Sequence, residues 1–187
     1  MRKLKRIVDL LPLFILWAML SVLLWGFVFT RITDTDHAHK LVFCVDAPVP
    51  GDTEIALELK KETREGIRLV RVLAFSYAMM DSKTLEEADL YLIPEDHAEI
   101  YRDWLLPLPD RLRAAGPLKV VNGVPVGVRV RDGETGKGVY PQWVQYPDQQ
   151  DYYLCLGAKS LHVTGLEGAV DGAAEEAFLR ILRSMEE

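Results

Sequence analysis

A long uncharged segment near the N-terminus constrains this chain more than any other feature. Residues 10–29 carry no charged side chain, and a basic cluster comes before them, formed by Arg2, Lys3, Lys5 and Arg6. Twenty helical residues rise about 30 Å, which matches the hydrocarbon thickness of a bilayer. The pattern predicts a transmembrane helix over residues 10–30 that crosses the cell membrane and contacts the lipid bilayer. The basic residues 1–9 are then cytoplasmic, and the chain after the helix is extracytoplasmic.

A cleaved secretory signal is the alternative interpretation of this segment. Such signals have a shorter apolar core and end at a cleavage site of small residues. Residues 29–33 read FTRIT, which is no such site. The uncleaved anchor is therefore favoured. Residues 31–40 are then a polar juxtamembrane linker, and residues 41–187 are long enough for one domain with its own core.

The charge of the chain limits the class of partner. The net charge is −6, and the first thirty residues carry four basic and one acidic side chain. The rest of the chain therefore carries −9. Proteins that bind nucleic acids rely on Lys and Arg to neutralise phosphates. No nucleic-acid partner is therefore expected.

Apolar β-rich runs alternate with amphipathic stretches in the first half of the external part. Strands are predicted over 41–45, 67–75 and 89–94, and helices over 53–65, after Asp81 and after Asp96. The second half predicts strands over 118–121, 124–130, 139–146 and 152–156, and then a terminal helix capped by Asp171. The resulting fold class is α/β: a single three-layer lobe with a mainly parallel, mixed sheet flanked by helices.

Five segments carry a resemblance to a known family. They read LVFCVD, RLVRVLAF, SKTLEEADLYLIPE, YYLCLGAKSLHVTG and AAEEAFLRIL. In this order they resemble one lobe of the type II periplasmic solute-binding proteins, the extracytoplasmic receptors of ABC importers. The last two segments are similar to the part where that family's chain returns to its first lobe and closes with a helix. The resemblance covers residues 40–187 and implies a role in transport.

One departure from the family limits that expectation. The family places its ligand between two lobes, whereas only residues 131–151 separate the predicted hairpin from the returning strand. One βαβ unit needs about thirty residues, so a second lobe does not fit there. We therefore expect a binding or interaction module that assists a transporter or sensor complex, with an ABC permease or a sensor as partner. A solute receptor completed by dimerisation or by docking on a permease is one alternative, and a surface hydrolase is another. An enzyme is not expected, because no nucleophile motif is present.

Polar residues follow the predicted parallel strands, where ligands of α/β proteins bind. Together they predict a rim for a peptide, an amine or a sugar, formed by Asp46, Ser76, Tyr77, Asp81, Ser82 and Glu95. The alternative is that these residues only cap helices and satisfy turns, which explains the same residue types without a ligand.

Three further groups invite a functional interpretation. Tyr140, Trp143 and Tyr146 form a partner interface or cover the core. His37 and His39 lie in the linker without a fixed geometry, so no metal or cofactor is expected. Ser160 and His162 are interpreted as a structural pair.

Two cysteines occur in the chain, Cys44 and Cys155. Two free buried thiols are favoured over a disulfide between them.

Overall fold

A computed structural model describes the backbone of residues 2–33, 35–61, 63–76, 83–147, 149–165 and 170–185. Within the first of these ranges it describes the side chains of residues 12–28. The chain divides into two compact units, Met1–Thr35 and Asp36–Glu187. Each unit is described below by itself.

The first unit is one helix, α1 (Arg2–Thr33). Within the described part of the chain, no helix combines the length and the apolar character needed to cross a membrane. The predictions of a transmembrane helix over residues 10–30 and of a single-pass location in the cell membrane are therefore wrong.

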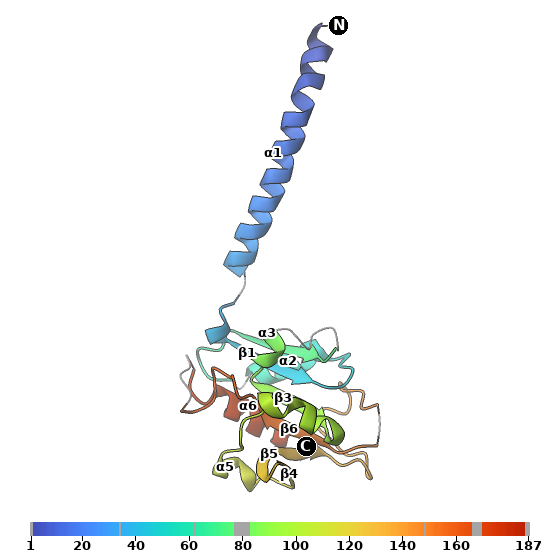
Figure 1. Cartoon of the computed structure of the whole chain (residues 1–187), viewed down its shortest axis with the longest axis vertical. Coiled ribbons are helices and arrows are strands. Elements are labelled where there is room, and N and C mark those ends of the chain that lie inside the picture. The colour runs from blue at the N-terminus through green and yellow to red at the C-terminus, as the bar shows by residue number, and fades with distance from the viewer. Residues whose placement is uncertain are drawn as a thin grey trace. The chain divides into compact units, whose positions relative to one another are not determined.

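The second unit contains one sheet of six strands in the order β2-β1-β3-β6-β5-β4 (Figure 1). In chain order the strands are β1 (Lys40–Val45), β2 (Leu69–Ala74), β3 (Leu90–Pro94), β4 (Leu118–Val121), β5 (Val124–Arg131) and β6 (Tyr152–Leu156). The predicted α/β class with a single sheet is confirmed.

The strand directions differ from the prediction of a mainly parallel sheet. Strand β1 pairs in parallel with β2 and β3, whereas the β3–β6, β5–β6 and β4–β5 pairs are antiparallel. The tight turn at Asn122 and Gly123, both with positive φ, forces β4 and β5 to run in opposite directions. The described residues between β5 and β6 include no helix, so no helical crossover makes these strands parallel.

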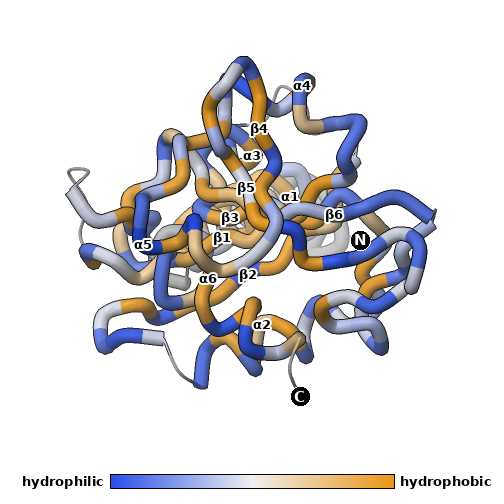
Figure 2. The backbone as a smooth tube through the Cα atoms, turned by 90° about the horizontal axis from the view of Figure 1, so that it is seen from below, coloured by the Kyte–Doolittle hydropathy of each residue, from blue (hydrophilic) through white to orange (hydrophobic). Residues whose placement is uncertain are grey.

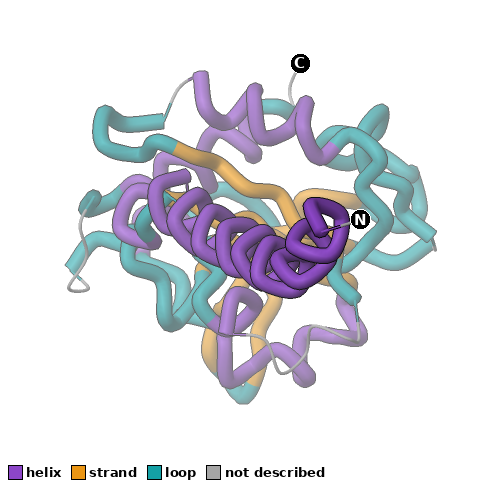
Figure 3. Tube along the Cα trace, turned by 90° about the horizontal axis from the view of Figure 1, so that it is seen from above, coloured by secondary structure: helices purple, strands orange, loops and turns teal. Residues whose placement is uncertain are grey.

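Helices cover both faces of the sheet (Figure 3). Helices α2 (Asp52–Lys61) and α6 (Ala173–Arg183) share a hydrophobic core with Phe43, while α3 (Lys83–Glu86) and α4 (Ala98–Tyr101) share another with Cys44. Successive residues of a strand point to opposite faces, so β1 and β3 are buried on both sides. Figure 2 shows hydrophobic residues concentrated along these strands. The remaining helical segments are η1 (His37–His39), η3 (Glu95–His97), η4 (Arg102–Trp104) and α5 (Asp110–Arg113).

Three local predictions need correction. Residues 139–146 form turns and not a strand, because the N–H groups of Trp143 and Val144 both donate to the Tyr140 carbonyl. The helix predicted after Asp96 is divided into η3, α4 and η4. Asp171 does not cap α6, because its carboxylate accepts the N–H of Gly165 and Gly172 precedes the helix.

Cys44 and Cys155 are free, buried thiols, as predicted. Both lie in register with Tyr91, on the strands at either side of β3. Two strand spacings separate their Cα atoms by about 10 Å, which is beyond the reach of a disulfide.

Candidate ligand-binding edge of the sheet

The parallel strands place their carboxyl ends along one edge of the sheet. From β1 the chain passes through α2 to β2 on one side, and then continues to β3 on the other side of β1. The strand order therefore reverses between β1 and β3. In open α/β sheets, ligands bind outside the carboxyl ends of the strands at such a point.

A hydrogen-bonded group of three side chains occupies this point. The Asp46 carboxylate follows β1 and lies 2.7 Å from Nδ1 of His97, which follows β3. The Tyr101 hydroxyl donates to the same carboxylate oxygen at 3.0 Å. The Asp46 N–H donates to the Leu92 carbonyl at 2.8 Å, which fixes the aspartate between the two strands.

The geometry assigns the ring nitrogens of His97. A carboxylate accepts hydrogen bonds, so Nδ1 carries the proton that points at Asp46 and Nε2 is left for another partner. The His97 side chain is 28% exposed and that of Asp46 is 12% exposed. Burial raises the pKa of Tyr101 above its ordinary value, and the charge of Asp46 raises it further. Tyr101 therefore stays a neutral donor, and His97 is the group of this trio that can receive a ligand.

An acidic pocket of about 640 Å³ adjoins the segment before His97, although His97 itself does not line it. Glu95 and Asp96, the two residues before His97, form part of its wall. The pocket contains five carboxylates and one guanidinium, with Asp132, Glu134, Asp151 and Arg129 completing the charged set. A pocket of this composition attracts positive charge.

Hydrogen bonds fix the position of the Asp151 carboxylate in the acidic pocket. It accepts hydrogen bonds from Nη1 of Arg129 at 3.0 Å and from the Gly133 N–H at 2.8 Å. Burial alone acts to raise the pKa of Asp151, but these donors outweigh it, so the pKa lies below its ordinary value. Glu95 is paired with Lys119 at 3.1 Å and is 53% exposed. The pocket therefore stays negatively charged near neutral pH.

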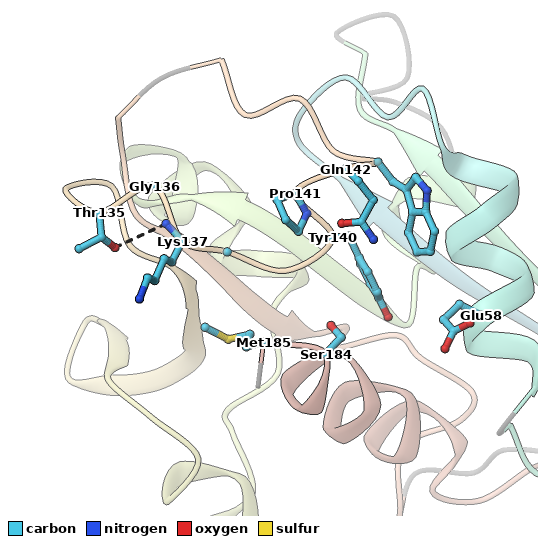
Figure 4. Close-up of a pocket in the computed structure, with 11 residues that line it drawn as sticks. Glu58, Thr135, Gly136, Lys137, Tyr140, Pro141, Gln142, Ser184 and Met185 are labelled. Atoms are coloured by element: carbon cyan, nitrogen blue, oxygen red, sulfur yellow. Dashed lines mark hydrogen bonds between the residues drawn. The ribbon is translucent and has the colours of Figure 1, made fainter. Parts of the chain in front are cut away.

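A second hollow, the aromatic cleft, has a volume of about 860 Å³ (Figure 4). It lies between the loop of residues 135–143, the Glu58 side chain of α2 and the chain just after α6. Its walls consist of Glu58, Thr135, Gly136, Lys137, Gly138, Tyr140, Pro141, Gln142, Trp143, Ser184 and Met185. This mixture of aromatic and polar groups, and this volume, are typical of small-molecule sites.

The wall of the aromatic cleft is fixed to the segment after β1. The Gly51 N–H donates to the Trp143 carbonyl at 3.3 Å, and the Gln145 N–H donates to the Pro48 carbonyl at 2.9 Å. A Cβ atom at Gly51 would lie 2.6 Å from the Trp143 side chain, so only glycine allows this close approach.

Tyr140 adopts a strained backbone in the same cleft. Its φ is +48°, and among the described residues only Asn122 shares a positive φ without being glycine. Asn122 belongs to a tight turn that requires it, whereas an aromatic residue in this conformation costs about 1–3 kcal/mol. Such strain is concentrated at functional sites, which makes the aromatic cleft a binding candidate.

The structure brings together some of the predicted site residues. Asp46 lies at the centre of the edge, Glu95 lines the acidic pocket, and Ser76 is exposed just after β2. Three other residues of the predicted rim lie outside the part of the chain that the structure describes, and they are Tyr77, Asp81 and Ser82.

Of the predicted aromatic interface, Tyr140 and Trp143 line one cleft, and Tyr146 does not. The Tyr146 hydroxyl donates to the Val139 carbonyl at 2.7 Å, and its ring lies against Tyr152 and beneath the Arg131 guanidinium. Tyr146 therefore stabilises the loop through these contacts and does not form part of the cleft wall.

Sequence reasoning missed His97 and Tyr101 as members of the site. His97 could have been found, because it follows the third strand by three residues, at the edge where Asp46 follows the first. Tyr101 lies in the segment predicted as a helix after Asp96, and helical spacing does not reveal the carboxylate that its hydroxyl meets.

Ser160 and His162 belong to a different, buried cluster. The Ser160 hydroxyl donates to Asp89 at 2.6 Å, and the His162 N–H donates to the Ser160 oxygen at 3.0 Å. The hydroxyl does not point at the imidazole, so the pair lacks the geometry of a nucleophile and its base. Within the described ranges, no three His, Cys, Asp or Glu side chains are placed to hold a metal ion.

Comparison with known proteins gives no match for this chain, whether with family models, with curated proteins or with solved structures. The resemblance to a lobe of a solute-binding protein stays a prediction.

Proposed function

We propose that this protein is a binding module that holds a positively charged amine at the carboxyl edge of its sheet. The observation that carries the proposal is the 2.7 Å hydrogen bond between Asp46 and Nδ1 of His97, at the point where the strand order reverses. This bond orients the imidazole and leaves Nε2 for a ligand.

The charge of the neighbouring pocket supports an amine as the ligand. Five carboxylates face one guanidinium there, and Nε2 is the ring nitrogen of His97 that the bond to Asp46 leaves for a ligand. An anionic ligand would have to approach carboxylates that are already ionised. A sugar would leave most of these charges without a partner.

The arrangement of the chain supports a half-receptor, meaning a receptor with one lobe and without the second lobe that would close over the ligand. Strand β6 returns beside β3, and α6 closes the chain against the sheet. The proposal takes from the predicted resemblance to a single solute-binding lobe the expectation of a returning strand and a closing helix. The amine site is open on one side, so a partner chain would bury the ligand more completely.

Isothermal titration calorimetry of the full chain with spermidine tests the proposal. Glutamate and glucose are the control ligands. We expect saturable binding of spermidine alone, and a loss of at least tenfold in affinity in Asp46→Asn and in His97→Gln. Asp110→Asn is the matched control variant, because that carboxylate is 91% exposed on α5 and outside the site. Equal binding of glutamate, or no effect of the two site variants, would refute the proposal.

A hydrolase is the second candidate function. A histidine oriented by an aspartate is the general base of many hydrolytic sites, and Ser76 is exposed at the same edge. The test is hydrolysis of p-nitrophenyl acetate by the wild-type chain and by His97→Gln. Equal rates in the two proteins would exclude a catalytic role for His97 in this reaction.

A further inference from the structure

Strand β2 forms an open edge of the sheet. Among the described strands it pairs only with β1. The Phe75 N–H donates to the Val45 carbonyl at 2.7 Å, which shows the direction of the backbone groups at the end of β2. Backbone groups alternate along a strand, so the N–H and C=O groups of Val70 and Val72 point away from β1. An edge of this kind is a template for a further strand.

A groove of about 520 Å³ runs along this edge, between β2 and α2. The helix contributes Ala56 and Leu57, and the strand contributes Leu69. Leu57 is 60% exposed and Leu69 is 40% exposed. The groove therefore combines outward backbone groups with apolar side chains, which is the combination that binds extended peptides by strand addition.

The charged residues of the groove are mainly basic. They are Lys60, Arg68 and Arg71, with Asp52 as the one acidic residue. Lys60 donates to the Ile67 carbonyl, whereas neither arginine forms an ion pair within the described part of the chain. The whole chain carries a net charge of −6, so this basic strip is a local exception.

We propose that the β2–α2 groove binds an extended acidic segment of a partner protein, which adds to the sheet as a strand beside β2. The backbone of the segment bonds to the outward groups of Val70 and Val72. Its carboxylates pair with Arg68 and Arg71, and its apolar side chains contact Leu57 and Leu69.

A second copy of this chain is a poorer occupant of the groove. Antiparallel pairing of two β2 strands would bring the arginines of both copies close together. Like charges opposite each other destabilise a strand pair. An acidic segment has the opposite charge and avoids this repulsion.

Fluorescence anisotropy of the full chain with a labelled peptide tests the proposal. The probe alternates Glu and Val over roughly ten residues, enough for one edge strand. One control peptide alternates Lys and Val, and a second acidic peptide has proline in place of alternate valines. We expect binding of the first probe only, and weaker binding in high salt.

Variants of the chain identify the groove as the site. We expect the double variant Arg68→Glu with Arg71→Glu to lower the affinity for the acidic probe at least tenfold. Arg102→Glu changes an exposed arginine outside the groove, and it should leave this affinity unchanged. Amide exchange provides a readout that does not depend on the variants: the probe should slow exchange at Val70 and Val72.

Several results would overturn the inference. They are equal binding of the basic or proline peptide, unchanged exchange at the two amides, and dimerisation through β2 of the chain by itself. His97→Gln should leave peptide binding unaltered, so failure of the amine proposal is distinguishable from failure of this one.

Discussion

Replacement of Asp89 tests how a buried carboxylate stabilises the sheet. Asp89 is 2% exposed. One carboxylate oxygen accepts the Val42 N–H at 2.7 Å, and the other accepts the Ser160 hydroxyl at 2.6 Å. The side chain thereby joins the start of β3 to β1 and to the turn after β6. Its removal affects three separate segments of the chain.

The expected loss of stability follows from the two donors that are left behind. A buried donor without an acceptor costs about 1–3 kcal/mol, and the Ser160 hydroxyl can rotate toward another acceptor. Asp89→Ala should therefore lower the free energy of unfolding by about 2–4 kcal/mol. Asp89→Asn keeps one acceptor oxygen and should cost about 1 kcal/mol.

The pH dependence of stability gives a second, independent signature. Burial raises the pKa of Asp89 above its ordinary value of 3.8, and the hydrogen bond from Ser160 opposes this only in part. Between the ordinary and the raised pKa, the folded protein keeps a proton that the unfolded chain has released. The stability contribution of Asp89 is therefore fully present below the ordinary pKa and is lost as the pH rises through the raised one. Its slope is up to about 1.4 kcal/mol per pH unit.

Urea denaturation between pH 4 and pH 7, monitored by tryptophan fluorescence, measures both effects. The stability advantage of wild type over Asp89→Asn should narrow as the pH rises. A constant difference across this range would contradict the raised pKa. A loss below 0.5 kcal/mol in Asp89→Ala would contradict the role of the two hydrogen bonds.

Three further predictions concern packing and burial. Gly157→Ala should cost more than about 3 kcal/mol in urea denaturation, because its Cβ would lie 1.9 Å from the Ala88 carbonyl oxygen; a normal midpoint would contradict this packing. Gly123→Ala has open space but a φ of +79°, so its cost should be only about 1 kcal/mol. Burial raises the pKa of Cys44 to about 12 and also raises that of Cys155, so neither thiol should react with Ellman's reagent at pH 8 until the chain unfolds; rapid reaction of the folded protein would disprove their burial.

The candidate site was predictable from the sequence only where local order determines it. Asp46 follows an apolar run that reads as a buried strand, and its place at the carboxyl edge needs no further information. His97 lies at the same edge, but its partner is 51 residues away in the chain. The pairing depends on β3 lying directly beside β1, which no local pattern specifies.

Residue patterns alone specify the strands of the sheet, because short β-rich apolar runs leave few alternatives for β1, β3 and β6. They also specify the β4–β5 hairpin through Asn122 and Gly123. The tertiary structure alone decided that β6 runs antiparallel to β3 and that residues 139–146 form turns around the Tyr140 carbonyl. The physical reason is that strand direction and loop shape depend on contacts between segments far apart in the chain, whereas residue periodicity reports only which face of an element is buried.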